Sequence, residues 1–150
     1  MFSLYTLDAR DQEAPIKLII NSDGGETFSG HGIYDAIRDM HAPVEGYVQG
    51  HAMSAAMFPL LACEKRWMTS TSLLMIHGMT EWGVGDARSM DADQDAMTKT
   101  INVEADIFTK HSTVKDREYW REILRDHLPR YYTADEALSL GLIDAIITSD

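Results

Sequence analysis

A serine, a histidine and a glycine pair occur in segments where they could together carry out acyl-transfer chemistry. Ser54 is the one hydroxyl in the small, apolar segment GHAMSAAM, His77 ends the apolar run in LLMIHG, and Gly24 and Gly25 follow another apolar run in NSDGGE. A serine hydroxyl attacks a carbonyl efficiently only when a base takes its proton and N–H donors stabilise the resulting oxyanion. The three segments hold one candidate for each of these roles.

Each of these segments also has a purely structural interpretation. The small residues around Ser54 suit a helix start in a crowded core as well as a tight turn that exposes the hydroxyl. A lone histidine after an apolar run is often a hydrogen-bonded structural residue, and a glycine pair often only forms a turn. The chemical interpretation therefore depends on whether the fold brings the three segments together.

The elements that must position these residues alternate between strand-like and helix-like patterns. Short apolar, β-branched runs predict strands, and apolar residues at helical spacing predict helices. Strands are expected over residues 16–21, 44–50, 73–77 and 142–147. Helices are expected over residues 32–40, after Ser54, over 90–111, after Thr113 or Asp116, and after Thr133, where Glu136 completes a capping box. This alternation is typical of an α/β domain with a mostly parallel sheet.

Composition limits the classes of function. The 150 residues fit a single domain, residues 1–150, and 13 Lys and Arg against 24 Asp and Glu give a formal charge of -11. This balance argues against a nucleic-acid partner and against an anionic membrane surface, because both need clustered basic residues. Cys63 has no partner for an intrachain disulfide, and no apolar run approaches the ~18 residues of a membrane span. We expect a cytoplasmic protein.

The histidines do not indicate a metal centre. None shows the paired spacing of a zinc motif or a cysteine partner. Apart from the candidate base, they are His31, His41, His51, His111 and His127. No structural metal is expected.

Four segments, in their order along the chain, resemble the ClpP family of Clp protease proteolytic subunits. They are INSDGGETFSGHGIYDAI, GHAMSAAM, LLMIHG and TADEALSLGLID, and the resemblance runs from about Leu7 to Asp150. It implies a crotonase-like α/β fold in which packed helices surround a mostly parallel sheet and one helix protrudes as a handle.

The resemblance also implies a role for each candidate residue. Ser54 corresponds to the nucleophile and His77 to the general base, and the backbone N–H groups of Gly25 and Ala55 correspond to the oxyanion hole. Counting forwards from the histidine places the family's acid on Asp126. Counting backwards from TADEA places it on Pro129, which cannot orient an imidazole. Asp126 is preferred because a loop can absorb an insertion more easily than the preceding helices, and Asp135 is a remote substitute.

The implied activity is that of a serine endopeptidase that hydrolyses peptides and unfolded proteins inside a ring chamber. The family forms homo-oligomers of two stacked heptameric rings, a tetradecamer, and works with an AAA+ unfoldase. No organic cofactor or metal is expected, and ATP would be used only by the partner. In the family the long helix forms the handle through which the rings meet, which makes Trp82, Met90 and Met97 candidate contact residues.

Two departures from the family concern regulation. The chain begins where the family's first helix is ending, so the preceding strand and axial loop are missing, and we expect gating to be absent or altered. The positions that correspond to the family's unfoldase-docking pockets carry a mixed set of residues. They are Lys17, Ile19, Trp67 and Thr69.

Two other functions are compatible with the sequence. One is a catalytically inactive ring subunit, structural or regulatory, that kept the serine and histidine but lost a working acid. The other is an acyl-CoA-handling enzyme of the same fold, which would use the glycine loop to bind a thioester oxyanion. The second is less favoured because such enzymes generally need no serine and histidine at these positions.

Overall fold

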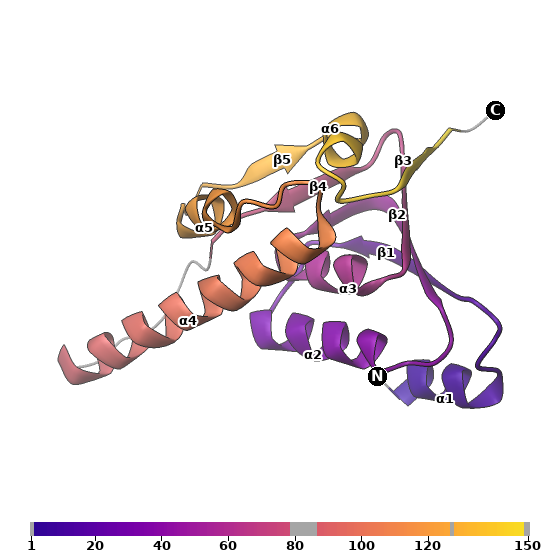
Figure 1. The fold of residues 1–150 in the computed structure, drawn as a ribbon, viewed down its shortest axis with the longest axis horizontal. Helices are drawn as coiled ribbons and strands as arrows, with labels where there is room; N and C mark the ends of the chain where they lie inside the picture. Colours follow the sequence, from indigo (N-terminus) through magenta and orange to yellow (C-terminus); the bar gives the residue numbers. More distant parts are fainter. Residues whose placement is uncertain (1, 79–86, 127, 149–150) are drawn as a thin grey trace.

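In the computed structural model, which describes residues 2–78, 87–126 and 128–148, a curled six-stranded sheet is surrounded by helices (Figure 1). The strands are β1 Ile16–Ser22, β2 Val44–Met53, β3 Lys65–Thr69, β4 Leu73–Ile76, β5 Arg130–Tyr132 and β6 Ala145–Ile147. The helices are α1 Phe2–Arg10, α2 Thr27–Arg38, α3 Met57–Ala62, α4 Ala87–His111, α5 Arg117–Arg125 and α6 Ala134–Ser139, and the 3-10 turn η1 is Ser54–Ala56.

The long strand β2 organises the sheet. The strand order is β5-β4-β2-β3-β6, with β1 paired to β2 outside this path. The first half of β2 pairs with β3 and its second half with β4, and each of these pairings is parallel, as are those of β1 with β2 and β3 with β6. Only β4 with β5 is antiparallel among the described strands. The predicted α/β fold with a mostly parallel sheet is confirmed.

The pairing of β2 with β4 brings two chain segments of the predicted site to the same edge of the sheet. Met53 at the end of β2 is the parallel partner of Met75 in β4. Ser54 follows the first and His77 lies two residues beyond the second. Because paired parallel strands end at the same edge, both side chains leave the sheet at neighbouring points.

The core joins the sheet to the helices through large buried side chains. Phe108 of α4 stacks on Trp120 of α5, with ring centroids 4.9 Å apart. The Trp120 indole N–H donates to the Val114 carbonyl oxygen at 3.1 Å, so its one polar atom is satisfied inside the core. Burial of such side chains contributes roughly 2–3 kcal/mol each. This contact fixes α4 and α5 as one side of the site.

The handle predicted over residues 90–111 is present as α4, which projects away from the sheet in Figure 1. It begins at Ala87, three residues earlier than expected. Trp82 lies outside the described residues, as does the side chain of Met90. Met97 packs partly buried against the hydrophobic core of its own chain.

The helix after the glycine pair begins earlier than the apolar spacing predicted. It starts at Thr27 rather than near Gly32, because the Glu26 carboxylate accepts hydrogen bonds from the N–H groups of Phe28 and Ser29 at 2.8 and 2.6 Å. A carboxylate at a helix start satisfies N–H groups that lack intrahelical partners and interacts favourably with the helix dipole. The glycine loop is therefore held directly against the beginning of α2.

Candidate active site

Ser54 lies at a strained strand-to-helix turn. β2 ends at Met53, η1 begins at Ser54, and the Ser54 φ of 53° is the positive value of a left-handed conformation. For a residue other than glycine this conformation costs on the order of 1–3 kcal/mol and persists only where the surroundings impose it. Ala55 and Ala56, both buried, pack behind the turn. The strand-to-helix turn predicted at this serine is confirmed, and with its buried alanines it is also the helix start in a crowded core that the sequence left open.

The glycine pair packs against this turn from the other side. Gly24 and Gly25 have φ values of 101° and 145°, which disfavour any side chain. A Cβ on Gly24 would lie 2.5 Å from the Met53 carbonyl oxygen and 2.9 Å from the Ser54 Cβ, so only glycine permits this approach. Within the described residues the Gly25 N–H has no acceptor. The N–H of Ala55 lies in the first turn of a helix, where intrahelical partners are lacking.

One of the two imidazole nitrogens of His77, Nδ1, is hydrogen-bonded to the backbone. His77 follows β4 directly, and its Nδ1 is 2.5 Å from the Gly78 carbonyl oxygen. Because a carbonyl oxygen only accepts, Nδ1 carries the proton, which leaves the Nε2 lone pair as the basic site. This is the tautomer that a general base needs, and here a backbone carbonyl holds it.

Gly78 also joins the end of β4 to the end of α5. Its N–H donates to the Asp126 carbonyl oxygen at 3.1 Å. A Cβ on Gly78 would meet the Leu124 carbonyl oxygen and lie 3.0 Å from its carbonyl carbon. The two segments touch backbone to backbone, so this position tolerates only glycine.

The carboxylate of Asp126 is directed elsewhere. Its Oδ1 accepts from the Leu128 N–H at 3.1 Å, and its Oδ2 is 3.4 Å from the Arg130 guanidinium. Among residues 2–78, 87–126 and 128–148, no hydrogen bond joins Asp126 to His77 or His77 to Ser54. The backbone of Asp126 thus contacts Gly78, the residue after His77, but the Asp126 side chain makes no hydrogen bond to His77.

The two other positions considered for the acid lie in exposed segments. Pro129 precedes β5 in an exposed stretch. Asp135 lies in the exposed first turn of α6, whose predicted capping box between Thr133 and Glu136 is present. Neither residue lines the site.

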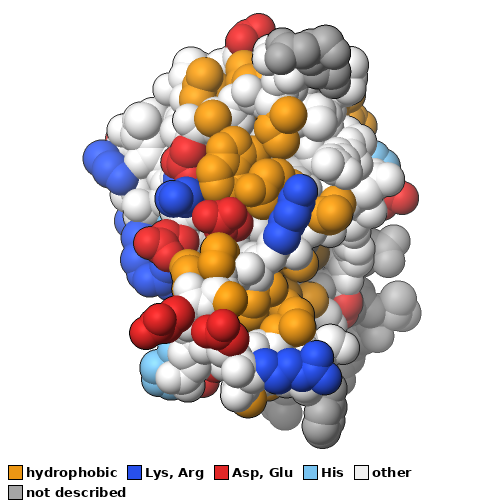
Figure 2. All heavy atoms as spheres, turned by 90° about the vertical axis from the view of Figure 1, so that its right-hand side faces the viewer, with side chains coloured by type: hydrophobic (Ala, Val, Ile, Leu, Met, Phe, Trp, Pro, Cys, Tyr) orange, Lys and Arg blue, Asp and Glu red, His pale blue; other side chains and the backbone are white. Residues whose placement is uncertain are grey.

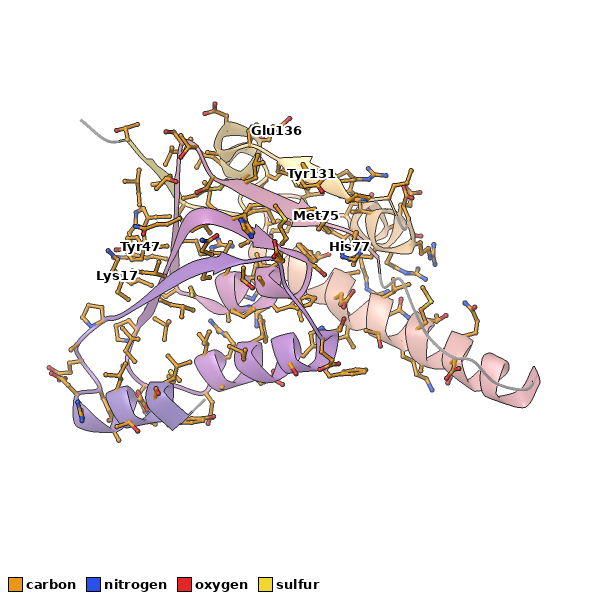
Figure 3. All side chains as sticks on the ribbon, turned by 180° about the vertical axis from the view of Figure 1, so that it is seen from behind. Lys17, Tyr47, Met75, His77, Tyr131 and Glu136 are labelled. Carbon is orange, nitrogen blue, oxygen red and sulfur yellow. The ribbon has the colours of Figure 1, made fainter. Side chains whose placement is uncertain are left out.

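The predicted nucleophile, base and oxyanion-hole residues line one cavity of about 500 Å³, a volume typical of small-ligand sites. The apolar part of the wall includes Ile76, Leu124 and phenylalanine rings from three helices, Phe28, Phe58 and Phe108. Two carboxylic acids, Glu26 and Glu104, complete the polar part. Figure 3 shows the His77 side chain close to α5 and to the part of α4 that lies nearest the sheet.

The two acids of the cavity differ in their partners. The Ser29 hydroxyl, followed by the Phe28 N–H, holds the pKa of Glu26 below its usual range. Both Glu26 oxygens are engaged in capping α2. Glu104, in contrast, is buried and has one partner in the described structure, His31, whose Nε2 is 3.5 Å from Oε1.

Comparison with known proteins identifies the family of this chain. A family model described as Clp protease matches residues 1–150. The ATP-dependent Clp protease proteolytic subunit of Deinococcus radiodurans is 32% identical over 146 residues, which cover 96% of this chain and 70% of that protein. The ATP-dependent Clp protease proteolytic subunit 1 of Protochlamydia amoebophila is 33% identical over 150 residues, which cover 97% of this chain and 71% of that protein. The chain belongs to the Clp protease family.

The ClpP fold of this family accounts for the curled sheet and the projecting α4. Within the described part of the chain, no cluster of three His, Cys, Asp or Glu residues could bind a metal ion. Over the same residues, no helix has the length and apolar character needed to cross a membrane.

A second surface of this Clp protease family chain lies at the opposite end of the sheet from His77. Figure 3 shows Lys17 and Tyr47 there, and Figure 2 shows hydrophobic side chains gathered on that face with charged groups at their margins. The Lys17 Nζ lies 4.2 Å from the Tyr47 ring centroid, and Tyr47 stacks on Trp67 at 4.6 Å. Ile19 is 56% exposed beside them in β1. We call Lys17, Ile19, Tyr47 and Trp67 the aromatic strip.

Sequence reasoning missed Glu104 and Gly78. A signal for Glu104 was present, because Ile101, Ala105 and Phe108 form the buried stripe of α4 and Glu104 falls within it. An acid on an apolar stripe is a more informative observation than any exposed charge. Gly78 had no comparable signal, since its role depends on a contact with α5 across the fold.

Proposed function

We propose that the chain is a ClpP-type serine endopeptidase that hydrolyses peptides and unfolded proteins. The observation that carries the proposal is that Ser54, His77, Gly25 and Ala55, which come from three separate segments, line one cavity. Family membership supports the same assignment, since two relatives are named as proteolytic subunits. The chemistry needs no metal or organic cofactor.

In the proposed reaction, Ser54 Oγ attacks the scissile carbonyl while His77 Nε2 takes its proton. The Gly78 carbonyl oxygen stabilises the Nδ1–H of the imidazolium that forms. The N–H groups of Gly25 and Ala55 donate to the oxyanion. His77 then passes the proton to the leaving amine, and water attacks the acyl-serine with the same histidine as base.

We assign the third catalytic position to Asp126. Its carboxylate is held by a 3.4 Å ion pair with Arg130 in which both side chains are partly exposed. Such pairs contribute little free energy, so the Asp126 carboxylate can leave Arg130 at little cost. The His77 Nδ1–H would then donate to Asp126 in place of the Gly78 carbonyl oxygen, and one Asp126 oxygen could keep the Leu128 N–H. If Asp126 serves as the acid, Asp126→Asn should lower the rate by on the order of 10⁴-fold. If the Gly78 carbonyl alone orients the imidazole, the loss should be less than about tenfold.

We further propose that the chain assembles into two stacked heptameric rings and works with an AAA+ unfoldase, which would be the only component to use ATP. The relatives' names describe them as subunits of an ATP-dependent protease. The aromatic strip offers exposed apolar area for such docking at the end of the sheet away from the cavity. The charge of -11 gives no support for a nucleic-acid partner.

A serine-reactive fluorophosphonate probe tests the peptidase. Wild-type protein should be labelled at Ser54, and both Ser54→Ala and His77→Ala should lose the label. Retained labelling in Ser54→Ala would place the reactive group elsewhere. Intact-mass measurement locates the adduct, and sedimentation or native mass spectrometry verifies that each variant assembles as wild type does.

A catalytically inactive ring subunit is the second candidate. It is favoured by the engagement of Asp126 with Arg130 and of His77 with Gly78. An assembled wild-type ring whose Ser54 is not labelled by the probe would support it and contradict the peptidase.

A further inference from the structure

Glu104 is a buried acid inside the cavity that the proposed peptidase chemistry does not use. It lies on α4 with 3% of its surface exposed and lines the same cavity as Ser54 and His77. Burying a carboxylate costs several kcal/mol unless hydrogen bonds or a counter-charge compensate it. The position therefore calls for a partner.

The one partner of Glu104 in the described structure, His31, satisfies little of the hydrogen-bonding capacity of the carboxylate. His31 Nε2 lies 3.5 Å from Glu104 Oε1, within ion-pair range, yet this nitrogen makes no hydrogen bond among the described residues. The imidazole is held by ring contacts instead, with centroids 4.5 Å from Phe58 and 6.0 Å from Phe28. An ionised carboxylate can accept about four hydrogen bonds. Most of the acceptor capacity of Glu104 is thus unused.

Unused acceptor capacity is not a general feature of the acids in this cavity, because Glu26 is hydrogen-bonded through both carboxylate oxygens. Its Oε1 accepts from the Phe28 N–H at 2.8 Å, and its Oε2 accepts from the N–H and the hydroxyl of Ser29 at 2.6 and 2.7 Å. That carboxylate is committed to the start of α2. Of the two acids that the described residues contribute to this cavity, Glu104 is the one left to meet a ligand.

We propose that Glu104 determines specificity by binding the cationic side chain of a lysine or arginine that supplies the scissile carbonyl. The proposal rests on the proposed peptidase function and names its substrate class. The rings of Phe58 and Phe108 form an apolar wall suited to the methylene stem, and the carboxylate suits the charged head. Hydrogen bonds to a charged partner are worth more than those between neutral groups, which gives the cavity a preference for cations.

Norleucine provides the matched probe, because it shares the lysine stem and lacks the ammonium group. Binding of acetyl-Ala-Ala-Lys-methylamide and of its norleucine counterpart is measured by calorimetry in the Ser54→Ala background, where no cleavage can occur. The lysine peptide should bind about tenfold tighter or more, the usual range for a charged hydrogen bond. Glu104→Gln, which keeps the shape, should bring the ratio to about one.

Two further variants separate recognition from a structural ion pair. Glu64→Gln removes an exposed acid away from the cavity and should keep the wild-type ratio. His31→Gln removes the competing partner of Glu104 and should raise the ratio. If the His31–Glu104 pair is purely structural, the ratio of lysine-peptide to norleucine-peptide binding should be the same in His31→Gln as in wild type. That result would count against Glu104 as the group that binds the ammonium.

The reactive serine is read independently with diphenyl phosphonates that carry lysine or norleucine side chains. A binding preference that depends on Glu104 supports the specificity proposal even where Ser54 stays unlabelled, an outcome that counts against the peptidase alone. Equal binding of the two peptides, no binding of either at millimolar concentration, or a preference retained in Glu104→Gln would each overturn the specificity proposal.

Discussion

The sharpest single test of the site's architecture is Gly78→Ala. Gly78 accepts a hydrogen bond from His77 Nδ1 and donates one to the Asp126 carbonyl oxygen. An added methyl group would meet the Leu124 carbonyl oxygen, would lie 3.0 Å from the Leu124 carbonyl carbon, and would be 3.2 Å from the Asp126 oxygen. These are backbone atoms at the end of α5, so they cannot move aside as a flexible side chain would.

The clash sets the expected magnitude. Overpacking a well-filled site usually costs about 1–3 kcal/mol of folding free energy, and the rigid backbone partner places this variant toward the upper end. Relief requires the chain after β4 to move away from α5, which carries His77 with it. A displacement of about 1 Å in a catalytic group lowers reactivity by on the order of 10²-fold.

The assay combines urea unfolding with the rate of fluorophosphonate labelling at Ser54. Gly32→Ala is the matched control, since Gly32 lies inside α2 and a Cβ there has no atom within 4 Å. That variant should label as wild type and gain about 0.5–1 kcal/mol of stability from the better helix former. Wild-type stability and labelling in Gly78→Ala would refute the claim that this backbone contact positions His77.

Three other predictions concern strain and burial. Ser54→Gly should be about 1 kcal/mol more stable to urea than Ser54→Ala, because glycine accepts the positive φ; equal stability would contradict strain at this turn. Burial, with Arg66 adding to it, lowers the pKa of His111 from 6.5 to about 4. The unfolded chain therefore binds this proton first, and stability should fall by on the order of 2 kcal/mol as the pH drops from about 6.5 to 4. A pH–urea series on His111→Gln should lack this loss. Burial raises the pKa of Cys63 to about 12, so a colorimetric thiol reagent should modify it only on unfolding, and rapid native modification would contradict the burial.

Much of the fold could be predicted because its signals are local. The run IKLIIN forms β1, and Thr133 with Glu136 caps α6 as expected. Asp116, one of two caps considered, is the N-cap of α5 and accepts from the Glu118 N–H. β5 was missed because three residues after a proline show no readable alternation, and its pairing with β4 comes from tertiary contact.

The site was predictable to the extent that it depends on strand ends. Ser54 and His77 could be expected to meet once both were assigned to the ends of parallel strands, and the structure brings them to one cavity. The direction of the Asp126 carboxylate could not be predicted, because it depends on Arg130 in a strand that the sequence did not reveal. Its role as the acid stays a prediction.

Backbone contacts, more than side-chain bonds, assemble this cavity. Met53 pairs with Met75 across the sheet, Gly24 touches the Ser54 turn, and Gly78 touches the end of α5. Each contact depends on a hydrogen-bonded register or on the absence of a Cβ, which many different surrounding sequences can accommodate. Such contacts can therefore hold Ser54, His77 and the glycine loop of this chain together while the surrounding side chains vary. The side chains of the cavity wall are not fixed by backbone register or by a need for glycine. An acid such as Glu104 can therefore stand there and change which substrate side chain the cavity binds.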